Sequence, residues 1–162
     1  MIRVGLGYDV HPFGDDAGRP LVLGGVTIEG RGLSGHSDAD AVCHSVSDAL
    51  LGPAGLPDLG SLFPASDDTY RDASSLVLLR DVVMRVADAG WSVVNVDVVV
   101  NAEEPRLAPH LGAMRDNISD ALRGAHVSVT PKRGEGLGAI GHGEGIQCWA
   151  VALLESVESS GD

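Results

Sequence analysis

The chain has 162 residues, enough for one domain with a buried core, and its 44% hydrophobic and 21% charged residues are typical of globular proteins. Its net charge of -12 argues against a nucleic-acid-binding protein, because phosphates would be repelled. No segment approaches the roughly 18 consecutive apolar residues of a membrane span, and the N-terminus enters a strand pattern without a leader, so we expect a cytoplasmic protein, or a trimmed organelle protein, that binds neither nucleic acid nor membrane.

The predicted elements begin with a strand over residues 2–10 and a hairpin of residues 21–23 and 26–28. Ser37 is expected to cap a helix, with Asp40 at the capping-box position, and this helix should end near Leu51 at Gly52-Pro53. The remaining pattern predicts a helix over 74–89, a strand over 91–101, a helix from Pro109 through Leu122, a short strand over 127–130, and a last strand over 145–157 that could also be a buried helix.

This order favours an α+β fold in which helices cover one face of a single sheet. The uncovered face of such a sheet needs a partner, which points to an oligomer. We expect one domain over residues 1–157 and a polar tail over 158–162, with fraying from Glu155 onward. Cys43 and Cys148 lie far apart in apolar contexts, so we expect two buried free thiols rather than a disulfide or a cysteine-based zinc site.

A candidate metal site lies at the end of the first predicted strand. Asp9 and His11 are two residues apart, so both side chains leave the same face of a strand. His36 and His44 follow in the segment H-S-D-A-D-A-V-C-H, and an aspartate with two histidines would form a zinc site that keeps an open position. His44 falls on the polar face of its helix, where Asp48, four residues later, is placed to hydrogen-bond the second ring nitrogen.

A second candidate is a basic pair late in the chain. Lys132, the only lysine, precedes Arg133 in the segment P-K-R-G-E-G. Such a pair is often a solvated turn, but in so acidic a chain it is a candidate for holding an anion.

Five segments resemble the family of 2-C-methyl-D-erythritol 2,4-cyclodiphosphate synthases, the cyclases of the non-mevalonate isoprenoid pathway. They are G-L-G-Y-D-V-H-P-F, L-V-L-G-G-V, S-G-H-S-D-A-D-A-V-C-H-S-V-S-D-A-L-L-G, L-P-D-L-G-S-L-F-P and G-L-G-A-I-G-H-G-E-G-I. The resemblance implies a homotrimer with its sheets facing the three-fold axis and its sites at subunit interfaces. It implies conversion of 4-diphosphocytidyl-2-C-methyl-D-erythritol 2-phosphate to the cyclic diphosphate with release of CMP, by metal-assisted intramolecular phosphoryl transfer.

The resemblance also implies roles for individual residues. One zinc ion per subunit would bind Asp9, His11 and His44, and a magnesium or manganese ion between the phosphates would bind Glu135. His36 would act as a catalytic group on the reacting phosphates, and we add Arg133 as a second catalytic candidate on our own hypothesis, since it departs from the family pattern. The implied substrate-binding residues are Asp9, His11, His36, Ser37, Asp58, Gly60, Phe63, Pro64, Ala102, Pro105, Arg106, Leu107, Lys132, Arg133, Glu135, Ala139 and His142.

Several positions depart from the pattern of the family. Arg133 stands where a phosphate-binding threonine is expected, and Ala65 stands where an aspartate is usual. His142 replaces an arginine near the trimer axis, Ala139 replaces a large apolar residue there, and Arg106 stands where a lysine is common. We hypothesise that Arg133 supplies a positive charge to the phosphates in place of the threonine hydroxyl.

Two other functions stay open from the sequence. A zinc hydrolase of phosphate esters would also use three ligands and an open position, but it needs a positioned base, and no spare carboxylate–histidine pair stands out. A weakened homologue that binds a nucleotide or isoprenoid diphosphate without turnover would fit the altered P-K-R-G-E-G segment and Ala65.

Overall fold

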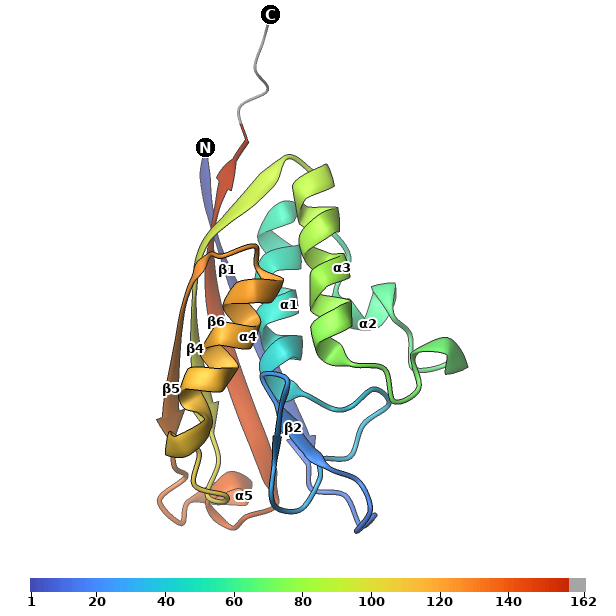
Figure 1. Ribbon diagram of the computed structural model, residues 1–162, viewed down its shortest axis with the longest axis vertical. Coiled ribbons are helices and arrows are strands. Elements are labelled where there is room, and N and C mark those ends of the chain that lie inside the picture. The colour runs from blue at the N-terminus through green and yellow to red at the C-terminus, as the bar shows by residue number, and fades with distance from the viewer. Residues whose placement is uncertain (158–162) are drawn as a thin grey trace, which may run out of the picture.

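A four-stranded mixed sheet carries the main helices on one face (Figure 1), as described by a computed structural model for residues 1–157. The strands lie in the order β1, β6, β4, β5 and span Ile2–Pro12, Gly145–Ser156, Trp91–Asn101 and His126–Lys132. Strand β6 runs antiparallel to both β1 and β4, and β5 runs parallel to β4. The carboxyl ends of β1, β4 and β5 therefore meet at the same end of the sheet.

The helix layer consists of α1, α3 and α4, which span Ala41–Ala54, Ser75–Asp88 and Leu111–Ala121. Shorter elements are α2 (Leu59–Leu62), α5 (Gly138–Gly141), the 3-10 turns η1 (Asp68–Tyr70) and η2 (Ala108–His110), and the hairpin of β2 (Leu21–Leu23) and β3 (Val26–Ile28). The predicted α+β fold, with helices on one face of a single main sheet, is confirmed. None of the helices within residues 1–157 is long and apolar enough to cross a membrane.

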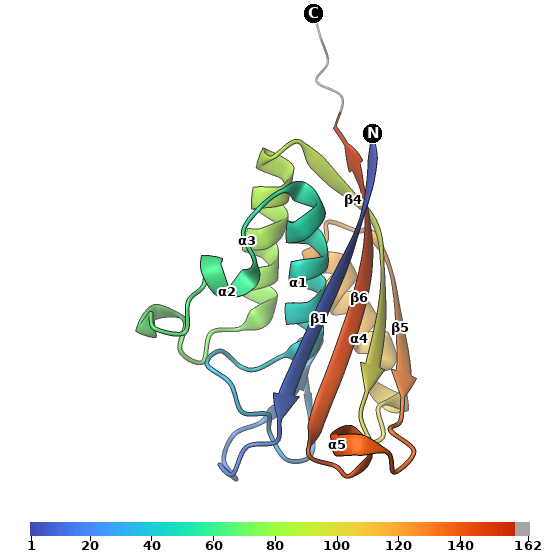
Figure 2. The same ribbon diagram turned by 180° about the vertical axis from the view of Figure 1, so that it is seen from behind.

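The two faces of the sheet differ in what covers them. On the helix face, Val96, Val98 and Val100 of β4 are fully buried. On the other face, which none of the described helices α1 to α4 covers, Val4 and Leu6 of β1 are 66% and 69% exposed (Figure 2). This alternation follows from the two-residue period of a strand, and it leaves an apolar surface without a partner among residues 1–157.

Two glycines let α1 lie directly against β1. A Cβ atom at Gly5 would collide with the carbonyl oxygen of Ala49, and one at Gly7 with the carbonyl oxygen of Ser45. Asp9 follows on the same face of β1, because strand residues two apart share a face. The glycines therefore bring the helix that carries His44 close to the strand that carries Asp9.

The boundaries of α1 differ from the prediction at both ends. The N-cap is Asp40 rather than Ser37, and its carboxylate accepts hydrogen bonds from the N–H groups of Val42 and Cys43 at 3.1 and 3.0 Å. It also accepts from Gly24 and Gly25 of the β2–β3 turn, so a full set of donors holds it at the start of the helix. The helix continues through Pro53 to Ala54, because proline in the last turn costs only one intrahelical donor and Gly55, with φ 75°, closes the helix.

The remaining sequence predictions need few changes. The last segment is strand β6, which extends to Ser156, so Glu155 pairs with Ile2 instead of fraying, and residues 158–162 of the predicted tail lie outside the described residues. Cys43 and Cys148 are buried free thiols as predicted.

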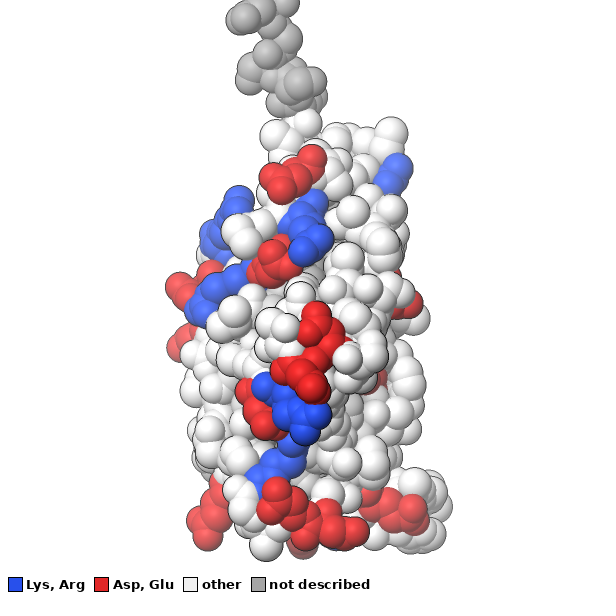
Figure 3. All heavy atoms as spheres, turned by 90° about the vertical axis from the view of Figure 1, so that its right-hand side faces the viewer, with Lys and Arg blue, Asp and Glu red and all other residues white. Residues whose placement is uncertain are grey.

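On the side of the molecule where α2 and α3 lie, basic and acidic side chains are interspersed and acidic groups gather at the lower end (Figure 3).

Candidate functional site

Asp9, His11 and His44 converge where the end of β1 meets the first half of α1. One ligand atom from each of these residues lies within 4.8 Å of the others. Oδ2 of Asp9 is 2.9 Å from Nε2 of His11 and 3.1 Å from Nδ1 of His44, and the two ring nitrogens are 3.3 Å apart. The strand spacing and the helix position that suggested a metal site therefore bring the three groups together.

The donor set fits a divalent metal such as zinc. His11 donates its Nδ1 proton to the carbonyl oxygen of Ser34 at 2.8 Å, because a carbonyl can only accept. In a neutral ring Nε2 of His11 then keeps the lone pair, and this atom faces the cluster, 2.9 Å from Oδ2 of Asp9. One carboxylate oxygen and two imidazole nitrogens are the ligand types of catalytic zinc sites, which keep a further position open.

The charges of the cluster favour an ionised carboxylate. Burial raises the pKa of the Asp9 carboxyl, but hydrogen bonds with His11 and His44 and the charge of the two rings outweigh burial and hold the pKa well below its usual range. Burial lowers the pKa of His11, while the hydrogen bond and negative charge of Asp9 outweigh burial and raise it. A metal ion bound here would supply the positive charge that stabilises the Asp9 carboxylate, in place of the two rings.

The cluster opens into a cavity of about 320 Å³, here called the metal-side cavity. Its lining residues are Asp9, His11, His36, Ser37, His44, Asp48, Leu59, Gly60, Phe63, Ala65, Tyr70 and Leu78. It thus gathers His36, Ser37, Gly60 and Phe63 of the predicted substrate-binding set around the metal ligands. Asp58 caps α2 beside this cavity, with its carboxylate accepting from Ser61 N–H at 2.6 Å.

His36, which lines the metal-side cavity, has a ring nitrogen without a hydrogen-bond partner among the described residues. Its Nε2 atom is buried and has no hydrogen-bond partner within residues 1–157. A buried ring nitrogen without a partner is costly, so a ligand that hydrogen-bonds it would gain free energy.

The predicted partner of His44 is wrong. Asp48 accepts a hydrogen bond from the backbone N–H of Leu59 at 2.9 Å, and burial raises its pKa. The Nε2 atom of His44 lies instead 3.0 Å from Oγ of Ser37 and 2.9 Å from Oγ of Ser75. Ser75 lies at the start of α3, and no spacing rule within one element could have connected it to His44.

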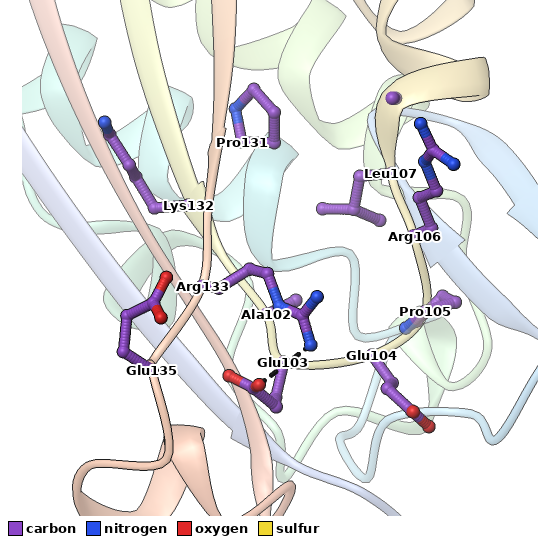
Figure 4. Close-up of a pocket in the computed structure, with 11 residues that line it drawn as sticks. Ala102, Glu103, Glu104, Pro105, Arg106, Leu107, Pro131, Lys132, Arg133 and Glu135 are labelled. Atoms are coloured by element: carbon purple, nitrogen blue, oxygen red, sulfur yellow. Dashed lines mark hydrogen bonds and ion pairs between the residues drawn. The ribbon is translucent and has the colours of Figure 1, made fainter.

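A second cavity of about 630 Å³ lies at the carboxyl ends of β4 and β5 and is here called the loop cavity (Figure 4). Its lining residues are Ala102, Glu103, Glu104, Pro105, Arg106, Leu107, Ala108, Pro131, Lys132, Arg133 and Glu135. All predicted residues of the A-E-E-P-R-L and P-K-R-G-E-G segments are therefore brought together. Glu103, which lies within the first of these segments, lines the same cavity.

Within the loop cavity, Arg133 crosses to the facing loop and donates to Oε1 of Glu103 at 2.9 Å (Figure 4). Lys132 and Glu135 lie on the other side of the β5 strand in this view. Oε2 of Glu103 is buried without a hydrogen-bond partner in the described part of the chain. The basic pair thus contributes to a cavity rather than to a bare solvated turn.

Neither cavity contains the whole set of predicted site residues. The metal-side cavity and the loop cavity share no lining residue, and β6 lies between the strands that end at them. His142 lines a third cavity, with Phe13 and Arg31, and Ala139 is exposed on α5. Pro64 lines neither the metal-side cavity nor the loop cavity.

Known sequences match this chain over nearly its whole length. The sequence profile of the YgbB family matches residues 2–155. A 2-C-methyl-D-erythritol 2,4-cyclodiphosphate synthase from Bordetella petrii is 55% identical over 155 residues, which cover 94% of each chain. The synthase of the same name from Rubrobacter xylanophilus is also 55% identical, over 157 residues and 94% of each chain.

Solved structures give the same relationship. The bifunctional IspDF of Campylobacter jejuni matches with a TM-score of 0.90 and 38% identity, over 96% of this chain and 42% of that longer chain. The CDP complex of IspF from Plasmodium falciparum matches with a TM-score of 0.83 and 34% identity, over 97% of each chain.

Proposed function

The chain belongs to the YgbB family, and from that premise we propose how its residues carry out the reaction of a 2-C-methyl-D-erythritol 2,4-cyclodiphosphate synthase. The enzyme, of the lyase class, converts 4-diphosphocytidyl-2-C-methyl-D-erythritol 2-phosphate to the 2,4-cyclodiphosphate and CMP. An oxygen of the 2-phosphate attacks the β-phosphorus, and the bond from that phosphorus to the oxygen of CMP breaks. Such a transfer needs positioning and charge stabilisation rather than covalent help from the protein.

The observation that carries this proposal is the convergence of Asp9, His11 and His44 at one wall of a cavity. These three residues would hold zinc, and Glu135 in the loop cavity would hold magnesium or manganese together with substrate phosphates. When bound, the two ions would supply Lewis-acid stabilisation of the phosphate oxygens.

The chain's own residues bind and orient the substrate in this proposal. Nε2 of His36, which has no partner among the described residues, would carry the ring proton and donate it to a phosphate oxygen. Gly60 and Phe63 would line the wall against the methylerythritol unit. Arg133 uses one of five N–H donors on Glu103, which leaves donors for a phosphate of the nucleotide. Lys132 and Arg106 add positive charge at the same cavity.

A complete site requires more than one copy of the chain. The carboxyl ends of β1 and β5 lie at the same end of the sheet but at opposite edges, so the metal-side cavity and the loop cavity of one copy are apart. The exposed apolar face of β1 supplies a surface for association. We propose a homotrimer with these faces toward the three-fold axis, in which the metal-side cavity of one copy meets the loop cavity of the next.

Turnover of the diphosphocytidyl substrate by the purified chain, with zinc and magnesium present, tests the proposed function. Phosphorus NMR should show the cyclic diphosphate and CMP forming in equal amounts. Release of inorganic phosphate from simple esters would favour the zinc hydrolase instead. Tight binding of CDP without any turnover would favour a weakened binding homologue.

A further inference from the structure

The two ring nitrogens of His44 face different surroundings. Nδ1 lies toward Asp9 and His11, at 3.1 and 3.3 Å, which is the side where the ligand atoms converge. Nε2 lies 2.9 Å from Oγ of Ser75, a side chain in a residue that is 1% exposed. A histidine that binds a metal through one nitrogen needs a partner for the proton on the other nitrogen.

The other hydrogen bonds of Ser75 determine whether Ser75 or His44 is the donor in this contact. The Ser75 hydroxyl donates to Oδ1 of Asp38, because a carboxylate has no proton to give. Its oxygen is then left as an acceptor for His44, so Nε2 of the imidazole must carry a proton, and in the neutral ring that a metal needs the lone pair is on Nδ1. Ser37, whose Oγ lies 3.0 Å from the same Nε2, can share that proton.

Asp38 is itself held firmly between two segments. Its Oδ2 accepts the backbone N–H of Ser75 at 3.0 Å, at the start of α3, where the N-cap residue Ser74 makes no side-chain cap. Its backbone N–H donates to the carbonyl of Ala73 at 3.1 Å. Asp38 therefore caps α3 from another part of the chain, and the same carboxylate orients the hydroxyl that meets His44.

We propose that Asp38 and Ser75 are positioning residues of the metal centre, which fix His44 in the Nε2-protonated tautomer with Nδ1 directed at the metal. This inference rests on the proposed metal centre of Asp9, His11 and His44 and adds the two residues that pre-organise it. A hydrogen-bonded partner of this kind also makes the ligating nitrogen more basic, which strengthens the metal bond.

The direct test is the protonation state of His44 in the zinc-loaded, full-length protein. A long-range proton–nitrogen NMR correlation spectrum should show the proton of His44 on Nε2. A proton on Nδ1 would overturn the proposal, and this measurement needs no variant that has to fold.

Variants measure the contribution of the contact. Ser75→Ala removes the hydroxyl but keeps the backbone N–H that Asp38 caps, and it should lower zinc affinity about 10- to 100-fold in chelator competition. Ser74→Ala, a change of the exposed neighbour without a side-chain cap, is the matched control and should leave zinc affinity unchanged. Equal affinity in Ser75→Ala and the unaltered chain would contradict the proposal.

Asp38→Ala removes both the acceptor for Ser75 and the cap of α3. We expect a zinc affinity at or below that of Ser75→Ala, and a lower midpoint of thermal unfolding. A variant that unfolds earlier but binds zinc as tightly as the unaltered chain would assign Asp38 to the cap alone and overturn its positioning role. If the unaltered chain took up no zinc, the proposed metal centre itself would fail, which is a distinct outcome.

Discussion

The metal-side cavity and the loop cavity are built in different ways, although both lie at the carboxyl ends of strands. The ligands of the first come from regular elements, β1 and α1, and His11 and His44 are each braced by a further hydrogen bond. The cationic side chains of the second belong to loops and strand ends, and Arg133 is 64% exposed and held by one ion pair. The comparison indicates a pre-organised candidate metal site, and a second cavity whose charged side chains are less constrained.

The largest effect is expected from removing one of the three predicted metal ligands of the metal-side cavity. His11→Ala should lower zinc affinity by at least about 100-fold, beyond the loss seen for outer partners of metal ligands, and abolish cyclisation. Metal content after dialysis and the formation of CMP would measure the two effects. Full activity of a zinc-free His11→Ala enzyme would break the comparison, because the braced cluster would then have no role in the reaction.

A charge on the open face of the sheet tests whether the two cavities work together across copies. Leu6 is 69% exposed on β1, and Leu6→Glu should convert the proposed trimer to single chains and remove most activity, since each copy then lacks the other's cavity. Light scattering after size exclusion would give the mass. Val77→Glu, at a 59% exposed apolar residue on α3, is the control and should change neither mass nor activity.

One added carbon atom is expected to disrupt the close packing of α1 against β1. Gly7→Ala places a Cβ against the carbonyl oxygen of Ser45, and we expect about 3 kcal/mol less free energy of unfolding and weaker zinc binding. Gly52→Ala, within α1 but in open space, should instead raise stability by up to about 1 kcal/mol. Denaturant unfolding compares the two, and similar stabilities would contradict the argument from close packing.

The smallest effect is expected from a change of Arg133 to threonine in the loop cavity. Arg133→Thr restores the residue type expected from the family resemblance and should keep cyclase activity within about 10-fold, whereas Arg133→Glu should lose about 100-fold or more by placing a negative charge beside the phosphates. Steady-state kinetics would separate these outcomes. Equal activity of the two variants would remove Arg133 from the phosphate site.

What the sequence could predict follows from the range of the interactions involved. Asp9 and His11 were predicted from a two-residue spacing, and the order of strands and helices from periodicity, because both depend on neighbours in one element. The start of α1 was misplaced since Ser37 looks like a cap, while its hydroxyl in fact meets His44. Ser75 joins His44 across 31 positions, and such contacts are created by packing, which a local pattern does not contain. Lys132 and Arg133 were predicted as an anion site from their charge in an acidic chain, and the other loop-cavity residues from the family resemblance. Their roles, the metal identities, the trimer and the cytoplasmic location stay predictions.

Strand β1 begins where β6 ends, and the amino group of Met1 donates to the side chain of Ser156 at 2.7 Å. Figure 1 shows this meeting point at the end of the sheet opposite α5. An affinity tag or a second catalytic module joined there would be separated from substrate entry by the length of the strands. Because the two ends adjoin, a short linker between them should also allow the chain to be reopened at a surface loop as a circular permutant.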